Sequence, residues 1–259
     1  MKSRFLGILK TLWAGSGQIN LGWSTFTSNF SSMEDKIWYL KQINILEDLT
    51  QEQLMSLGAQ CEMNKYKKGD TVYLTGNSKN IYFLKIGSIK LSSHTEDGKE
   101  IISEVLKGGE IFGKYLGEGV TRQEEATALD DVMVCYMPFE KWMEFIHIHT
   151  VLNVQIFKWV GFRIKRLERK LETLYFKDSK TKVTELLIDL SQRLGRNTGT
   201  DVLINVSLTH EEIAKLTGTG RQSVTTILNK LREDGLIEYN RNKIILKAGI
   251  FSSSHSIPA

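Results

Sequence analysis

Residues 209–224 read THEEIAKLTGTGRQSV and carry the strongest structural signal in the chain. Glu212 follows Thr209 by three residues, and Gln222 follows Thr219 by three residues. In a capping box, two side chains at this spacing bond each other's backbone amides at the start of a helix. The stretch therefore predicts two helices that begin about ten residues apart.

The residues around these two helices complete a winged helix-turn-helix. Gly218 tolerates the positive φ that a tight turn needs, and Ala214 is small enough to lie where two helices cross steeply. Apolar residues that would face a shared core are Ile213, Ala214 and Leu216 in the first helix, and Val224, Ile227, Leu228 and Leu231 in the second. After Asp234-Gly235, residues 237–239 and 243–247 are β-prone and predict a hairpin, the wing.

The start of the second helix has the side chains that DNA recognition uses. Arg can pair bidentately with guanine and Gln with adenine, while hydroxyls and the positive end of a helix dipole suit phosphates. The predicted DNA contacts are Thr209, His210, Thr219, Arg221, Gln222, Ser223, Thr225 and Thr226 in the helices, and Arg241 and Lys243 in the wing. A purely structural helical hairpin would show the same capping, but these polar residues and the wing favour a DNA-binding domain.

Upstream of this domain, the apolar pattern predicts one long helix with a heptad stripe. Its members are Phe157, Val160, Ile164, Leu167, Leu171 and Leu174, which alternate steps of three and four. The other faces are strongly basic. A helix lying on its own core would also show an apolar stripe, but so much charge around a narrow stripe favours a dimer seam.

The region from Met33 to Pro138 is punctuated by glycines, with short β-prone runs between them. Strands at roughly ten-residue intervals predict a β-sandwich or a small barrel. Asp97-Gly98, between two such runs, is a hairpin signal. With the helices downstream, the fold class is α+β.

Composition narrows the function classes. The chain has 259 residues, of which 41% are hydrophobic and 25% charged, as in ordinary globular proteins. A net charge of +4 suits a nucleic-acid partner, and two cysteines suit a reducing cytoplasm. No apolar run is long enough to cross a membrane. Lys2 and Arg4 precede a short apolar run as in a signal peptide, but Lys10 interrupts it.

The order of a glycine-punctuated β-roll, a long heptad helix and a winged helix-turn-helix resembles the Crp/Fnr family of the cyclic-AMP receptor protein and the fumarate-nitrate reduction regulator. The supporting stretches are Lys68–Asp70, Tyr82–Ile89, Gly109–Gly113 and Thr209–Val224. The resemblance implies a cyclic-nucleotide-binding-like β-roll (jelly roll) and a homodimer on a two-fold symmetric operator. It also implies DNA as a partner, RNA polymerase as a further one, and no enzymatic activity.

This resemblance gives a division of the chain into five segments. We expect a flexible extension over 1–32, with Met33 as an alternative start, and the β-roll over 33–145. The dimerisation helix would occupy 146–180 and the DNA-binding domain 181–250, followed by a flexible tail over 251–259. A polar break at Lys177–Thr181 predicts a hinge between the long helix and the next helix, Val183–Leu194.

The family's cyclic-AMP branch reads DNA with an Arg-Glu pair and a second Arg one turn later. Arg221 matches the first Arg, but Gln222 and Thr226 replace the other two residues. We therefore expect an operator that differs from that branch's half-site.

The effector pocket implied by the resemblance is incomplete. Gly109 and Glu110 match the Gly-Glu pair, and Arg122 matches the phosphate-binding Arg. Gln123 replaces the usual Ser, and Glu124 and Glu125 place negative charge beside the phosphate site. On the long helix, Leu167 and Glu168 stand where a Thr-Ser pair would contact adenine. Cyclic-nucleotide binding is therefore disfavoured, and a constitutive DNA binder without an effector stays an alternative.

Other site chemistries find little support. Cys61 and Cys135 are too few for an iron–sulfur cluster, and Cys135 lies in an apolar run typical of a buried thiol. His94, His147 and His149 lack Cys or carboxylate companions at metal-ligand spacing, so we expect no metal site. No nucleotide-binding or hydrolase motif occurs. The rival function is a cyclic-nucleotide-binding or protein-interaction module without specific DNA recognition.

Overall fold

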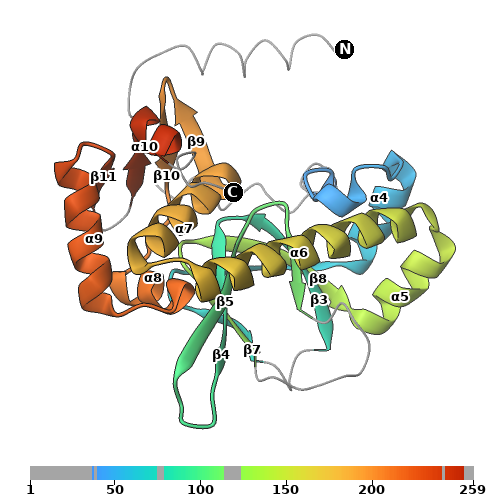
Figure 1. Ribbon diagram of the computed structural model, residues 1–259. Helices are drawn as coiled ribbons and strands as arrows, with labels where there is room; N and C mark the ends of the chain where they lie inside the picture. Colours follow the sequence, from blue (N-terminus) through green and yellow to red (C-terminus); the bar gives the residue numbers. More distant parts are fainter. Residues whose placement is uncertain (1–36, 38–39, 75–78, 114–123, 241–242, 254–259) are drawn as a thin grey trace.

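The computed structural model describes residues 37, 40–74, 79–113, 124–240 and 243–253. In Figure 1 the long helix α6 (Val151–Phe176) lies across a β-roll and separates two groups of helices. One group packs on the roll, and the other forms the C-terminal domain.

The roll consists of two four-stranded antiparallel sheets. The first has the order β1 (Glu62–Tyr66), β8 (Val132–Pro138), β3 (Asn80–Ile86) and β6 (Ile111–Gly113). The second has the order β2 (Thr71–Leu74), β7 (Glu124–Ala128), β4 (Ser88–His94) and β5 (Glu100–Lys107). The predicted hairpin at Asp97-Gly98 is confirmed: Gly98 has φ +75°, and its N–H donates to the carbonyl of Thr95.

Aromatic rings fill part of the space between the two sheets. Tyr82 stacks on Tyr73 and on Phe112, each with a ring-centroid distance of 5.1 Å. These rings are buried together with Leu84 and Leu91. The inner faces of the two sheets therefore form one packed core.

A second core lies on the outer face of the first sheet. There η1 (Asn44–Leu46), α4 (Gln51–Gln60) and α5 (Phe139–Ile148) cover β3 and β8. Trp142 of α5 packs edge-on against Phe83 at 5.4 Å between ring centroids. Cys61 and Cys135 are both buried in this core, as expected of structural thiols.

The apolar stripe of α6 is largely uncovered by the rest of the chain. Phe157 is 80% exposed, and Ile164, Leu167 and Leu171 are each about half exposed; Val160 and Leu174 are partly buried. The basic flank is different, because Arg163, Arg166 and Lys170 each contact β5. The stripe thus has room for a partner helix, and its role as a dimer seam stays a prediction.

The C-terminal domain combines helices with a small antiparallel sheet. Its elements are α7 (Ser179–Leu194), β9 (Gly195–Thr198), β10 (Asp201–Ile204), α8 (His210–Thr217), α9 (Arg221–Glu233), β11 (Ile237–Tyr239), β12 (Ile244–Leu246) and α10 (Ala248–Ser253). The sheet order is β11-β12-β10-β9, so the predicted wing extends into a four-stranded sheet. The α7 helix begins before the predicted Val183, because Asp178 caps it by accepting from the N–H of Thr181 at 2.7 Å.

The core of this domain also contains residues of the roll. Ile102 and Val105 of β5 and Leu129 are buried in one cluster with Val183 of α7 and Ile213 of α8. The outer face of the second sheet therefore forms part of the hydrophobic core of the C-terminal domain.

Candidate nucleic-acid interface

The first predicted capping box is confirmed. The N–H of Glu212 donates to Oγ1 of Thr209 at 3.1 Å, and the N–H of Thr209 donates to Oε2 of Glu212 at 2.8 Å. The second capping box is wrong. Gly220, with φ −81°, caps α9 without a side-chain bond, and the hydroxyl of Thr219 bonds that of Thr217 at 2.8 Å instead. Gln222 is consequently the second residue of α9 and not the third.

The turn between α8 and α9 depends on Gly218, which caps α8 in the left-handed region with φ +62°. A Cβ at this position would lie 3.3 Å from Cδ2 of Leu174, so the turn also lies close to the end of α6.

Replacing Gly218 by Ala should lower the free energy of unfolding by about 1–2 kcal/mol, because an L-residue is strained at this φ. Chemical denaturation of both proteins measures the difference. Gly218→Asn adds the same Cβ but tolerates the left-handed region, so it should recover part of the loss. Equal losses in the two variants would mean that crowding against Leu174, and not backbone strain, sets the cost.

The α9 helix has one buried face and one exposed face. Val224, Leu228 and Leu231 are almost fully buried, which fixes the helix on the domain core. Among the predicted contacts, Arg221, Gln222, Ser223 and Thr226 are exposed, whereas Thr225 is partly buried. The first turn therefore presents a contiguous polar surface.

Two of the predicted contacts also hold the two helices together. Nδ1 of His210 lies 2.8 Å from Oγ1 of Thr225, which in turn donates to the carbonyl of Arg221 at 3.0 Å. The hydroxyl of Thr226 donates to the carbonyl of Gln222 in the same way. The His210–Thr225 contact therefore ties α8 to α9, while the two hydroxyl–carbonyl bonds lie within α9.

The wing is attached to α9 by side chains that the sequence analysis did not single out. The Tyr239 hydroxyl donates to Oδ1 of Asn229 at 2.9 Å, and Arg232 donates to the same oxygen at 3.1 Å. The Arg232 guanidinium also lies over the Tyr239 ring, 5.4 Å from its centroid. Of the predicted wing contacts, Lys243 is exposed, and Arg241 lies outside the described residues.

A charged clasp joins the helix-turn-helix to the roll. The Lys90 ammonium lies 2.9 Å from Glu100 and 3.3 Å from Glu212, and Lys215 lies 2.8 Å from Glu100. Burial opposes ionisation of Glu100, but its hydrogen bonds from Lys215 and Lys90 prevail and lower its pKa to about 2. At neutral pH Glu100 is therefore ionised where it contacts Lys90 and Lys215.

The predicted effector residues lie only partly within the described chain. Gly109 has φ +100°, and the Glu110 carboxylate accepts from the N–H of Lys107 at 2.8 Å. Arg166 and Arg193 each lie 3.6 Å from that carboxylate. Arg122 and Gln123 lie outside the described residues. Glu110 thus has protein partners, and the cyclic-nucleotide role of these residues stays a prediction.

No three His, Cys, Asp or Glu side chains gather into a metal site in the described part of the chain. Nδ1 of His149 lies 3.2 Å from the side-chain nitrogen of Gln53, and His94 is exposed at the end of β4. Within the same residues, no helix combines the length and apolar character that crossing a bilayer requires.

Both domains of this chain match known protein families. A cyclic nucleotide-binding domain model matches residues 63–149, and a Crp-like helix-turn-helix domain model matches residues 181–248. The global nitrogen regulator of Synechocystis is 28% identical over 183 residues, covering 69% of this chain and 81% of that protein. The CRP-like cAMP-activated global transcriptional regulator of Mycobacterium tuberculosis is 23% identical, covering 80% and 93%.

Solved structures agree in fold. FixK2 from Bradyrhizobium japonicum superposes with a TM-score of 0.66 over 77% of this chain and 99% of that one, at 17% identity. The relatives are transcription regulators, and the two domain models follow each other in the order that the strands and helices show. The chain therefore belongs to the Crp/Fnr family of transcription regulators.

Proposed function

We propose that the protein is a homodimer that binds a two-fold symmetric operator in double-stranded DNA, with the α9 helix of each protomer in a major groove. The exposed polar first turn of α9, fixed on its domain by a buried apolar face, carries this proposal. Arg221, Gln222 and Ser223 would meet base edges and phosphates, while Lys243 of the wing would follow the backbone. Such a protein would act in the cytoplasm, where RNA polymerase is a further partner.

The dimer geometry follows from the uncovered stripe on α6. If two stripes pair, the two C-terminal domains lie on opposite sides of a two-fold axis, and both α9 helices can reach successive grooves. Selection of bound sequences from a random DNA library, with and without cyclic AMP, tests symmetry and ligand dependence together. We expect palindromic sites whose half-sites lie about one helical turn apart. Enrichment of asymmetric or unrelated sequences would contradict the proposal.

Replacing Arg221 by Ala should weaken binding to the selected operator by about 1–3 kcal/mol and relax one base position in each half-site. A gel-shift series over operator variants at fixed salt measures both effects. Lys230→Ala is the matched control: Lys230 is exposed more than two helical turns beyond Arg221, near the C-terminal end of α9, and pairs with Asp234. Loss of affinity in both variants to the same extent would mean that α9 contributes charge and not base recognition.

A further inference from the structure

A cavity of about 400 Å³ lies where the roll, the long helix and the DNA-binding domain meet. Ser103 of β5, Lys170 of α6, Asp189 of α7 and Thr217 of α8 each contribute to its wall. A volume of this size suits a small metabolite. Because both domains supply walls, the shape of the cavity depends on how they are placed against each other.

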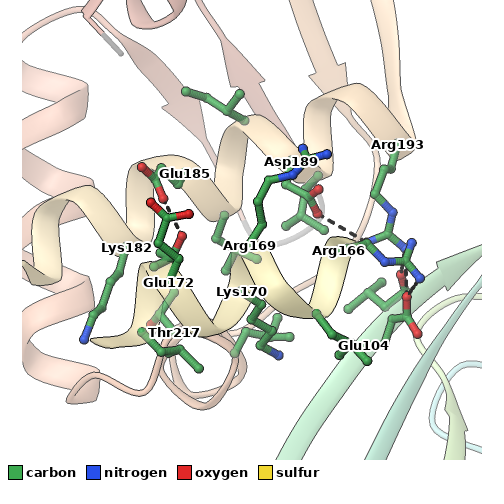
Figure 2. A pocket seen from close by; sticks show the side chains of 18 of the residues that line it. Glu104, Arg166, Arg169, Lys170, Glu172, Lys182, Glu185, Asp189, Arg193 and Thr217 are labelled. Carbon is green, nitrogen blue, oxygen red and sulfur yellow. Dashed lines mark hydrogen bonds and ion pairs between the residues drawn. The ribbon is translucent and has the colours of Figure 1, made fainter. Parts of the chain in front are cut away.

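At one end of the cavity, Arg166 and Arg193 lie close to the carboxylate of Glu104 (Figure 2). The carboxylate of Glu104, with only 10% of its side chain exposed, is the shared partner of three guanidinium groups. Arg163 lies 3.0 Å from it, Arg166 pairs with it, and Arg193 lies 3.8 Å away. Burial and the neighbouring Arg193 lower the pKa of Arg166 to about 10.

Lys170 adds a fourth cation at the same end. Its ammonium donates to the carbonyl of Ser103 at 2.9 Å and more weakly to that of Ile102 at 3.4 Å. No carboxylate of the described residues lies within 4.0 Å of it. Burial lowers the pKa of Lys170, and Arg166 and Arg193 lower it further against the opposing effect of Asp189. Two carbonyl bonds use two of the three N–H groups of the ammonium, so one donor is left for a ligand.

We propose that this interdomain cavity binds a small organic anion, whose carboxylate or phosphate group pairs with Lys170, Arg166 and Arg193. Glu110 and Asp189 also pair with these arginines, at 3.3–3.6 Å from the guanidinium nitrogens. An added anion would pair with the Lys170 ammonium, and forked guanidinium groups suit planar carboxylates and phosphates. The site differs from the family's nucleotide pocket because α7 and α8 form part of it.

The position of the site gives it a regulatory consequence, which rests on the proposed DNA-binding function. Lys170 and Arg166 belong to α6, whereas Arg193 belongs to α7 of the DNA-binding domain. An anion held by all three would fix the angle between these helices and so the spacing of the two α9 helices in a dimer. By linkage, the anion and the operator must change each other's affinity by the same factor.

Isothermal titration calorimetry on the full chain at constant ionic strength tests the site with three probes. Succinate represents a dicarboxylate, inorganic phosphate represents a phosphoryl group, and succinamide is the uncharged analogue. We expect succinate or phosphate to bind and succinamide not to bind. The anion that binds with the higher affinity shows whether the site prefers a carboxylate or a phosphate group. Failure of both anions to bind the wild-type protein at millimolar concentration would overturn the proposal.

Lys170→Gln provides the variant test, because its amide can still donate to the β5 carbonyls while the charge is removed. We expect its anion affinity to fall about tenfold or more. Lys165→Gln, on an exposed face of the same helix outside the cavity, should keep the wild-type affinity. If Lys170→Gln does not unfold cooperatively, Arg169→Gln at the exposed rim replaces it, with an expected loss of several-fold. Equal affinities of the cavity variant and Lys165→Gln would count against the site.

An operator titration with and without the bound anion separates the two proposals. Anion binding without any operator binding would refute the DNA-binding proposal and leave the site standing. Operator binding by a protein that takes up neither anion would refute the site alone. A change in operator affinity on anion addition that is absent in Lys170→Gln supports both.

Discussion

Replacing Glu104 by Gln should lower the free energy of unfolding by about 3 kcal/mol at neutral pH. The buried carboxylate is the common partner of Arg163, Arg166 and Arg193. Removing its charge leaves three neighbouring guanidinium groups without their shared carboxylate, and loss of one partner from a buried ionic cluster typically costs about 3–5 kcal/mol. Urea denaturation followed by far-ultraviolet circular dichroism measures the loss.

Glu172→Gln is the matched control for this substitution. Glu172 lines the same cavity but lies on an exposed position of α6, so its replacement should cost no more than about 0.5 kcal/mol. A Glu104→Gln protein as stable as this control would mean that the arginines find other partners or solvent, and that Glu104 does not hold α6 and α7 against the roll.

The double replacement of Leu167 and Leu171 by Ala should weaken dimerisation about a thousandfold. Both side chains are about half exposed in the single chain, and four of them would be buried in each dimer at about 1 kcal/mol apiece. Operator affinity should fall together with dimerisation, because only a dimer presents two α9 helices. Sedimentation velocity over a concentration series measures the association, and a gel shift measures the DNA affinity.

Phe162→Ala is the corresponding control on the same helix. Phe162 is 72% exposed, yet helical periodicity places it on the side of α6 away from the stripe. This variant should dimerise like the wild type. A tight dimer in the Leu167/Leu171 double variant would show that the dimer contact lies elsewhere on the chain.

Local signals were enough to predict the DNA-binding domain. The capping box at Thr209 and the positive φ of Gly218 each follow from the identity of a few neighbouring residues. The second box failed for a local reason too: the glycine directly after Thr219 takes the cap position in an extended conformation. The Thr–Gln spacing alone does not show whether the threonine is the N-cap or lies one position before it.

Within the roll, the strands that the sequence analysis missed are those with little apolar patterning. The β1 strand reads EMNKY, and its residues are exposed or partly buried; β7 reads EEATA, and β6 has only three residues. Each joins its sheet through ladder hydrogen bonds to a strongly patterned neighbour, β8, β4 or β3. These strands therefore form because they pair with their neighbours in the sheet, and not because of their intrinsic β-propensity.

The charged contacts between domains could not be predicted from a single sequence. Lys90 meets Glu212 across 122 positions, and Arg193 donates to the carbonyl of Val105 across 88. No spacing rule relates residues so far apart. For the same reason, the sequence alone did not indicate that part of the basic flank of α6 faces β5.

The shared core between β5 and α8 limits how this protein can diverge. Ile102 and Val105 belong to the β-roll by sequence but to the C-terminal domain by packing. A substitution on either side changes the volume available to the other, so the two surfaces must evolve together. A chimera that joined this roll to the helix-turn-helix domain of a relative would pack poorly between β5 and α8. Exchanging the outer-face residues of β5 together with that domain would restore the packing. The two domains follow each other in the sequence, but the residues of their shared core are expected to change together.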